Sequence, residues 1–179
     1  EAGHAGTVPM TMRADAGMAM SRLLLSLRDA ARAEAERGRG HFTATIGVMK
    51  FEPNGANVVP GAAEAIVDIR AENDAAMDDY LSEIDTLAKD AASAEGCRVA
   101  ATERLSRTFA VLCDPRLQNI IRDAAEVHGL ATRPLASGAG HDAAFVARLA
   151  PAAMIFVPSK GGISHAPEEW TDTEAIARA

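Results

Sequence analysis

Cysteine, clusters of basic residues and long apolar runs are all scarce in this sequence, and each absence excludes a class of protein. The only cysteines are Cys97 and Cys113, whose spacing fits neither a disulfide framework nor a thiolate zinc site, so a reducing compartment is expected. No apolar run approaches the ~18 residues of a membrane-spanning helix. Lysine and arginine form no run and the net charge is −7, which argues against nucleic acid or an anionic membrane as a partner.

The sequence does contain enough apolar material for a folded core. Hydrophobic residues make up 48% of its 179 residues, which suffices for one good core or two small ones. With the negative charge, this composition predicts a soluble, cytoplasmic protein that acts on a small molecule. No secretory signal is visible, and the chain begins at Glu1 without a methionine, from which we expect that the natural amino terminus lies upstream.

The first half of the chain predicts helices packed on a sheet. Apolar residues spaced at three and four indicate one helix from Ala14 to about Arg37 and another from Asn73 or Asp74 to Gly96. Strands are expected at 41–51, 61–70 and 97–107. If the region around Gly3 ends an earlier strand, the order is β-α-β-β-α-β, the ferredoxin-like arrangement.

Beyond Thr108 the pattern changes to that of an α/β layer. Helices are expected from Asp114-Pro115 to Gly129, from His141 to Leu149 and from Thr171 onward, and strands at 132–135 and 152–157. A piece this short cannot close a core of its own, so we expect two domains, residues 1–108 and 109–179, of which the second is incomplete.

One decapeptide, Gly161 to Trp170, has the composition of a ligand-binding loop. It follows the strand expected at 152–157 and centres on His165, whose second ring nitrogen could be held by Glu168 or Glu169. A neutral imidazole presented in a cleft could bind a metal ion or act in catalysis. The alternative interpretation is a surface histidine without a role.

Other stretches strengthen the functional interpretation of this loop. They are Gly3 to Met10 followed by Arg13 and Asp15, Asn57 to Gly61, Asp68 to Arg70, and Ser137 to Ala143. These motifs and Gly162 to His165 occur in an order and spacing by which the chain resembles the carbamoyl-amide hydrolases of the aminoacylase-type metallopeptidase clan. This group contains N-carbamoyl-L-amino-acid hydrolases, ureidopropionases and allantoate amidohydrolases. The resemblance runs from His4 to Trp170.

The resemblance implies a mixed α+β and α/β fold. Residues 1–108 would be a ferredoxin-like (βαββαβ) dimerisation or lid domain with a truncated first strand, and residues 109–179 the carboxyl-terminal part of an α/β di-metal hydrolase domain. The amino-terminal catalytic half, which supplies most metal ligands and the general-base glutamate, would precede Glu1. The complete enzyme would be a homodimer with two divalent metal ions, either zinc or manganese, cobalt or nickel.

The resemblance also implies roles for three histidines. His165 would ligate one metal ion, and His141 would lie beside the cleft and help to bind or polarise the scissile carbonyl. His4 would reach the active site of the neighbouring subunit and stabilise the tetrahedral oxyanion. From the residues alone, His4 is equally well explained as part of a flexible entry to the first helix. Val8 departs from the family, which usually has a second threonine after Thr7.

Substrate binding would fall to Arg70, Asn57 and Gly140. An arginine can grip a carboxylate with two parallel hydrogen bonds, an asparagine can donate or accept, and a glycine lets backbone N–H groups approach the substrate. The alternatives are structural: Arg70 pairs with Glu64 or Asp68 on its own strand, and Asn57 is a turn residue.

These expectations together predict part of a metal-dependent hydrolase acting on linear amides. Its reaction would be cleavage of the carbamoyl C–N bond of N-carbamoyl amino acids or allantoate-like substrates, and the chain would be inactive by itself. One alternative is an aminoacylase or peptidase of the same clan. Another, from a different class, is a stand-alone ferredoxin-like module for dimerisation or ligand binding.

Overall fold

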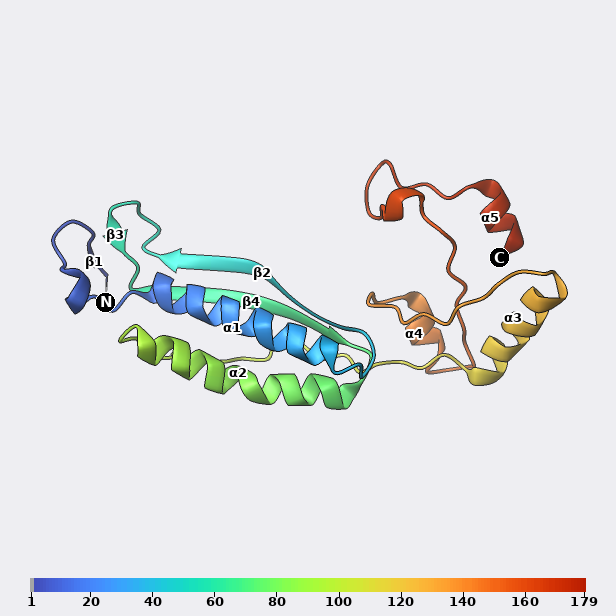
Figure 1. Ribbon diagram of the computed structural model, residues 1–179, viewed down its shortest axis with the longest axis horizontal. Coiled ribbons are helices and arrows are strands. Elements are labelled where there is room, and N and C mark those ends of the chain that lie inside the picture. Colours follow the sequence, from blue (N-terminus) through green and yellow to red (C-terminus); the bar gives the residue numbers. More distant parts are fainter. Residues whose placement is uncertain (1) are drawn as a thin grey trace. The chain divides into compact units, whose positions relative to one another are not determined.

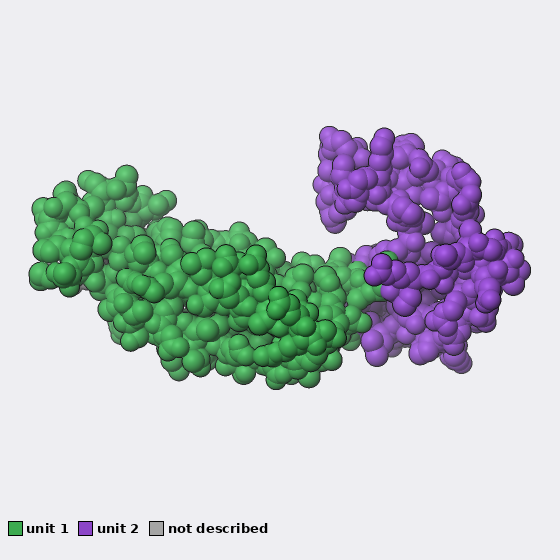
Figure 2. Space-filling view, viewed as in Figure 1, with its two compact units in different colours: residues 1–110, 135–139 green, residues 111–134, 140–179 purple. Residues whose placement is uncertain are grey.

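The computed structural model describes residues 2–179, which form two compact units (Figure 2). The first unit contains the residues up to Ala110 together with Leu135–Ala139, and the second contains Val111–Pro134 and Gly140–Ala179. The sequence suggested a break near Thr108, and it did not indicate that Leu135–Ala139 would associate with the first unit. Among the described residues, no helix is both long and apolar enough to cross a membrane.

Two long helices and a two-stranded antiparallel sheet make up most of the first unit (Figure 1). The helices are α1 (Ala16–Glu36) and α2 (Asp74–Ala94), and the strands are β2 (Phe42–Glu52) and β4 (Ala62–Ala71). Each helix begins where the sequence supplies a cap. The side chain of Asp15 accepts hydrogen bonds from the first backbone N–H groups of α1, and that of Asn73 does the same for α2.

The core of this unit lies between the two helices and one face of the sheet. Its buried members are Leu27, Ala31, Phe42, Ala76 and Tyr80. Tyr80 joins three elements, because its ring stands edge-on to that of Phe42 at 5.2 Å between centroids and its hydroxyl donates to the carbonyl of Leu27 at 2.9 Å. The period-two alternation predicted for β4 is confirmed, since its inward residues are half-buried and its outward ones exposed. In β2 the alternation holds from Phe42 to Ile46 and then breaks at a bulge, so that Val48, predicted to face inward, is 38% exposed.

A buried carboxylate fastens the end of α1 to α2. Glu34 is only 4% exposed and accepts hydrogen bonds from Arg37 at 2.7 Å and from two nitrogens of Arg39 at 2.9 and 2.7 Å. Arg39 also reaches Asp79 of α2 at 2.6 Å. These arginines hold the pKa of Glu34 below its usual range, with the Arg39 hydrogen bonds as the main cause.

A short ribbon closes the end of the first unit that holds the amino terminus (Figure 1). It pairs β1 (Gly3–His4) with β3 (Val58–Val59), with His4 opposite Val58. A 3₁₀ turn, η1 (Met10–Met12), leads from this ribbon toward α1.

The second unit has helices but no buried core. Its elements are α3 (Pro115–Val127), α4 (Asp142–Val146), the 3₁₀ turn η2 (Lys160–Gly162) and α5 (Thr173–Arg178). No residue of this unit is buried, and large apolar side chains stay exposed, such as Val127 at 83% and Leu149 at 91%. An apolar surface of this kind requires a covering layer.

Three predicted strands do not form in the described residues. Segments 97–107, 132–135 and 152–157 carry no ladder hydrogen bonds, and the helix predicted over 141–149 is regular only from Asp142 to Val146. The physical reason is that a strand exists by pairing with another strand. Apolar alternation predicts which residues can be buried in a sheet, but it does not provide the neighbour.

Candidate functional site

His4 and Asn57 lie together at the ribbon end of the first unit. The backbone N–H of Ala5 donates to the carbonyl of Asn57 at 2.8 Å, which joins the two motifs directly. The Nδ1 atom of His4 accepts a hydrogen bond from the backbone N–H of Gly6 at 3.1 Å. A neutral imidazole that accepts through Nδ1 carries its proton on Nε2, so the outer ring nitrogen of His4 is a donor.

Arg13 holds the loop that carries His4. Its guanidinium donates to the carbonyl of Val8 at 3.1 Å and to that of Ala5 at 2.6 Å. The sequence contained this arginine within the first motif without revealing what it does. Its position five and eight residues from its two acceptors is not regular enough to predict such a clamp.

Arg70 lies near the far end of β4. Its Nε and Nη2 atoms donate to the two carboxylate oxygens of Asp68 at 2.8 and 3.2 Å, and its Nη1 atom donates to the carbonyl of Gly138 at 2.9 Å. Of the two structural partners predicted for Arg70, Asp68 is therefore confirmed and Glu64 is wrong, because Glu64 faces Lys50 at 3.9 Å across the strands. All three residues project from the same face of the strand, but Asp68 is two residues from Arg70 and Glu64 is six residues away.

Asn57 and Arg70 stand at opposite ends of the first unit. Strand β4 separates them with 10 residues, and at roughly 3.3 Å per residue this amounts to on the order of 30 Å. One small ligand therefore cannot touch both residues of the same chain. The expectation that they bind one substrate is possible only if the two residues come from different subunits.

The second unit holds Gly140 and His141 at the start of α4. The carbonyl of His141 accepts from the N–H of Ala144 at 2.9 Å, and its ring stands edge-on to Phe156 at 5.9 Å between centroids. A Cβ atom added to Gly140 would meet nothing within 4 Å, so the backbone at this position is open to approach.

His165 lies in a loop of left-handed backbone. Its φ of 56° follows those of Gly161 (66°) and Gly162 (69°), and it is the only described residue other than glycine with a positive φ. The Glu169 carboxylate accepts a hydrogen bond from the backbone N–H of His165 at 2.8 Å. Glu169 therefore acts on the backbone of His165, whereas the sequence suggested a contact with its ring. Histidine is one of the few residues other than glycine that adopt this conformation, and the functional role of His165 stays a prediction.

No group of three or more histidine, cysteine, aspartate or glutamate side chains within residues 2–179 is arranged to hold a metal ion. A catalytic zinc ion needs about three protein ligands. The described residues therefore do not complete a metal centre by themselves, and His165 as a metal ligand stays a prediction.

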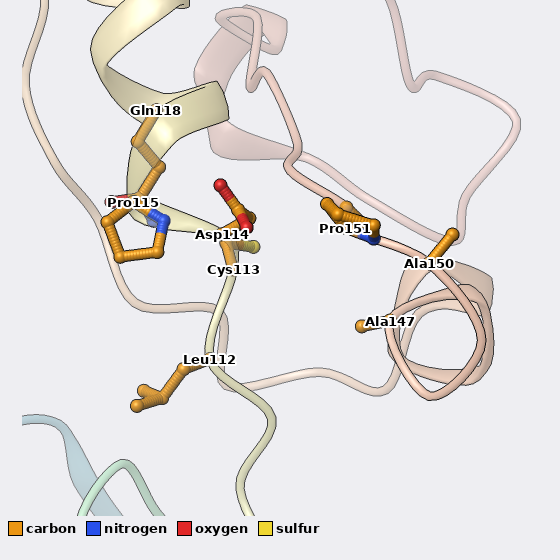
Figure 3. Close-up of a pocket in the computed structure, with 9 residues that line it drawn as sticks. Leu112, Cys113, Asp114, Pro115, Gln118, Ala147, Ala150 and Pro151 are labelled. Carbon is orange, nitrogen blue, oxygen red and sulfur yellow. The ribbon is translucent and has the colours of Figure 1, made fainter.

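One cavity of the second unit contains none of the predicted site residues. Its volume is about 580 Å³. The side chains that line it are drawn in Figure 3 and are those of Leu112, Cys113, Asp114, Pro115, Gln118, Ala147, Ala150, Pro151 and Ala152. The one carboxylate, that of Asp114, already accepts from the N–H groups of Arg116 and Leu117 at the start of α3. The cavity is thus a gap between uncovered elements.

Comparison with known proteins identifies the family. The model for Peptidase family M20/M25/M40 matches residues 2–179. The chain is 37% identical to an N-carbamoyl-L-amino-acid amidohydrolase of Rhizobium meliloti, over 97% of this chain and 41% of the relative. It is 34% identical to the allantoate amidohydrolase of Bacillus subtilis, over 98% of this chain and 42% of the relative. The chain belongs to the M20/M25/M40 peptidase family, and the predicted kinship with carbamoyl-amide hydrolases is confirmed.

Solved structures confirm the predicted fold class. An amidase of the hydantoinase/carbamoylase family from Burkholderia multivorans superimposes with a TM-score of 0.86 at 34% identity, over 99% of this chain and 42% of that one. The structure of AtUAH in complex with glyoxylate gives a TM-score of 0.84 at 28% identity, over 99% and 41%. The chain thus spans about two fifths of the length of the relatives that it matches.

Proposed function

We propose that this chain is part of a metal-dependent amidohydrolase that cleaves the carbamoyl C–N bond of N-carbamoyl amino acids or related ureido acids. Water and the ureido group would yield the amino acid, ammonia and carbon dioxide. The observation that carries the proposal is the geometry of Arg70. Among the described residues, its partners occupy one N–H on Nε and one on each Nη, which leaves one N–H on each Nη for a ligand carboxylate.

The distance between Asn57 and Arg70 supports a site built from two subunits. We propose a homodimer in which His4 and Asn57 of one protomer complete the site that contains Arg70 of its partner. His4 would donate from Nε2 to the oxyanion that forms on the ureido carbonyl, and Asn57 would hydrogen-bond the substrate. Gly140 and His141 would line the cleft beside the scissile bond, where Gly140 leaves the backbone accessible.

We also propose a metal requirement, which the family membership and the loop of His165 support. Two divalent ions, zinc or manganese, cobalt or nickel, would supply Lewis acidity toward the scissile carbonyl when bound. His165 would hold one of them, and the other ligands would come from residues outside this chain. The 179 residues alone are therefore inactive in our proposal. The exposed apolar surface of the second unit supports this proposal, because the remainder of a catalytic domain would cover it.

Two further features bear on location and on the alternative activity. Cys97 and Cys113 are both free thiols, which suits a reducing compartment, and we place the protein in the cytoplasm. The description of the family as peptidases keeps an aminoacylase or peptidase as the second candidate activity. A stand-alone ferredoxin-like module is a poorer explanation, because the family match extends through both units.

The test compares an N-carbamoyl amino acid with the corresponding N-acetyl amino acid and dipeptide, using the complete polypeptide that contains this chain. We expect hydrolysis of the carbamoyl compound, its loss on removal of metal, and a dimer in analytical sedimentation at micromolar concentration. Preferred cleavage of the acetyl compound or dipeptide would favour the second candidate. A strictly monomeric active enzyme would refute the two-subunit site.

A further inference from the structure

The outward face of β4 carries two ion pairs that differ in geometry. Asp68 and Arg70 are two residues apart, and the two carboxylate oxygens of Asp68 take hydrogen bonds from Nε and Nη2 of the same guanidinium. Glu64, on the same face, meets Lys50 of β2 through a single contact of 3.9 Å. Only the first pair fixes the plane of a side chain, because two parallel bonds prevent its rotation.

The third partner of Arg70 comes from a distant segment. Its Nη1 donates to the carbonyl of Gly138 at 2.9 Å, and Gly138 lies so close to His41 that an added Cβ atom would stand 2.8 Å from Nε2 of that ring. A glycine at this position therefore lets the carbonyl reach the arginine. The guanidinium is held on two sides, by a carboxylate of its own strand and by the backbone of Leu135–Ala139.

We propose that Asp68 is a positioning residue for substrate recognition, which holds the guanidinium of Arg70 so that its remaining Nη hydrogens meet the substrate carboxylate. This inference rests on the proposed function, in which Arg70 is the carboxylate anchor. An exposed arginine samples many rotamers, and a ligand that binds it must restrict them. Asp68 restricts the rotamers of Arg70 before the substrate binds, although its carboxylate also neutralises part of the positive charge of the guanidinium. Asp68 is ionised at neutral pH like any aspartate, and the hydrogen bonds and charge of Arg70 lower its pKa further.

The experiment uses the complete enzyme and two substrates, an N-carbamoyl amino acid and its carboxamide, which has no carboxylate. Asp68→Asn removes the charge and one of the two acceptors. We expect KM for the carboxylate substrate to rise about tenfold, the size of one charge-assisted hydrogen bond, with kcat little changed and the carboxamide unaffected. Glu64→Gln is the matched control, since it removes a charge from the same face of the same strand, and it should leave both substrates unchanged.

Arg70→Lys separates this inference from the proposed function. If that variant discriminates less between the two substrates while Asp68→Asn behaves as the native enzyme, Arg70 is the anchor and the positioning role of Asp68 is refuted. If Arg70→Lys has no selective effect on the carboxylate substrate, the anchor itself fails, and the inference with it. An equal loss on both substrates with Asp68→Asn would show a structural role and also overturn the inference. Asp68→Ala serves as a second variant with the same expectations should Asp68→Asn not fold.

Discussion

Tyr80 offers a sharp test of the core, because it is the only tyrosine of the sequence and it is 2% exposed. The substitution Tyr80→Phe keeps the ring against Phe42 and removes the hydroxyl that donates to the carbonyl of Leu27 at 2.9 Å. At neutral pH the loss of this hydrogen bond should lower the free energy of unfolding by about 0.5–1.5 kcal/mol.

The same substitution should have the opposite effect in alkali. Burial, with a smaller effect from the charge of Glu83, raises the pKa of Tyr80 to about 12, whereas an unfolded tyrosine has a pKa of about 10. Because the folded pKa is the higher one, the protonated phenol stabilises the fold fully below about pH 10, and this contribution is lost as the pH rises through about 12. The full difference corresponds to at most ~2.7 kcal/mol. This free energy is larger than that of the lost hydrogen bond, so Tyr80→Phe should become the more stable of the two proteins above about pH 11.

Urea denaturation of both proteins, followed by circular dichroism between neutral and alkaline pH, measures the pH at which their free energies of unfolding become equal. Tyrosinate absorbance gives an independent value, because no other tyrosine of the 179-residue chain contributes to it. Ionisation of the folded phenol near pH 10 would refute the argument from burial. A stability difference that does not change with pH would refute it equally.

The remaining predictions concern the helix junction, the Arg70 environment and the metal loop. Glu34→Gln should destabilise the first unit at neutral pH. Because the pKa of Glu34 is lowered in the folded protein, its contribution to stability is present above its unfolded pKa of about 4.3 and is lost as the pH falls through the folded pKa. The difference in unfolding free energy between variant and native protein, measured by chemical denaturation, should therefore shrink in acid. Gly138→Ala should cost ~1 kcal/mol of stability in the native background and much less with His41→Ala, and a double-mutant cycle that shows no coupling would contradict the close approach. Calorimetric titration of the 179-residue chain with zinc should find only weak binding, because nanomolar affinity corresponds to about 12 kcal/mol and His165 alone cannot provide it; a stoichiometric nanomolar site would refute the single-ligand interpretation.

Local sequence patterns predicted the helices and the long hairpin well. The helix expected from Ala14 to Arg37 is observed as Ala16–Glu36, and the strand expected over 61–70 as Ala62–Ala71. These elements follow from caps and apolar periodicity, which depend on neighbours in the chain. The strand expected over 97–107 was wrong for the described residues because it depends on a partner that periodicity cannot supply.

The candidate site shows the same division. The sequence by itself determined the family, through motifs whose order and spacing survive without coordinates, and it singled out Arg70 and His165 by residue type. Only the tertiary structure decided that Arg70 pairs with Asp68 and not with Glu64, and that the carbonyl of Gly138 is its third partner. It also decided that Glu169 bonds the backbone of His165 and that a whole strand separates Asn57 from Arg70. The reason is physical: residue type sets which bonds a side chain can make, whereas the folded backbone sets which partner lies within reach of it.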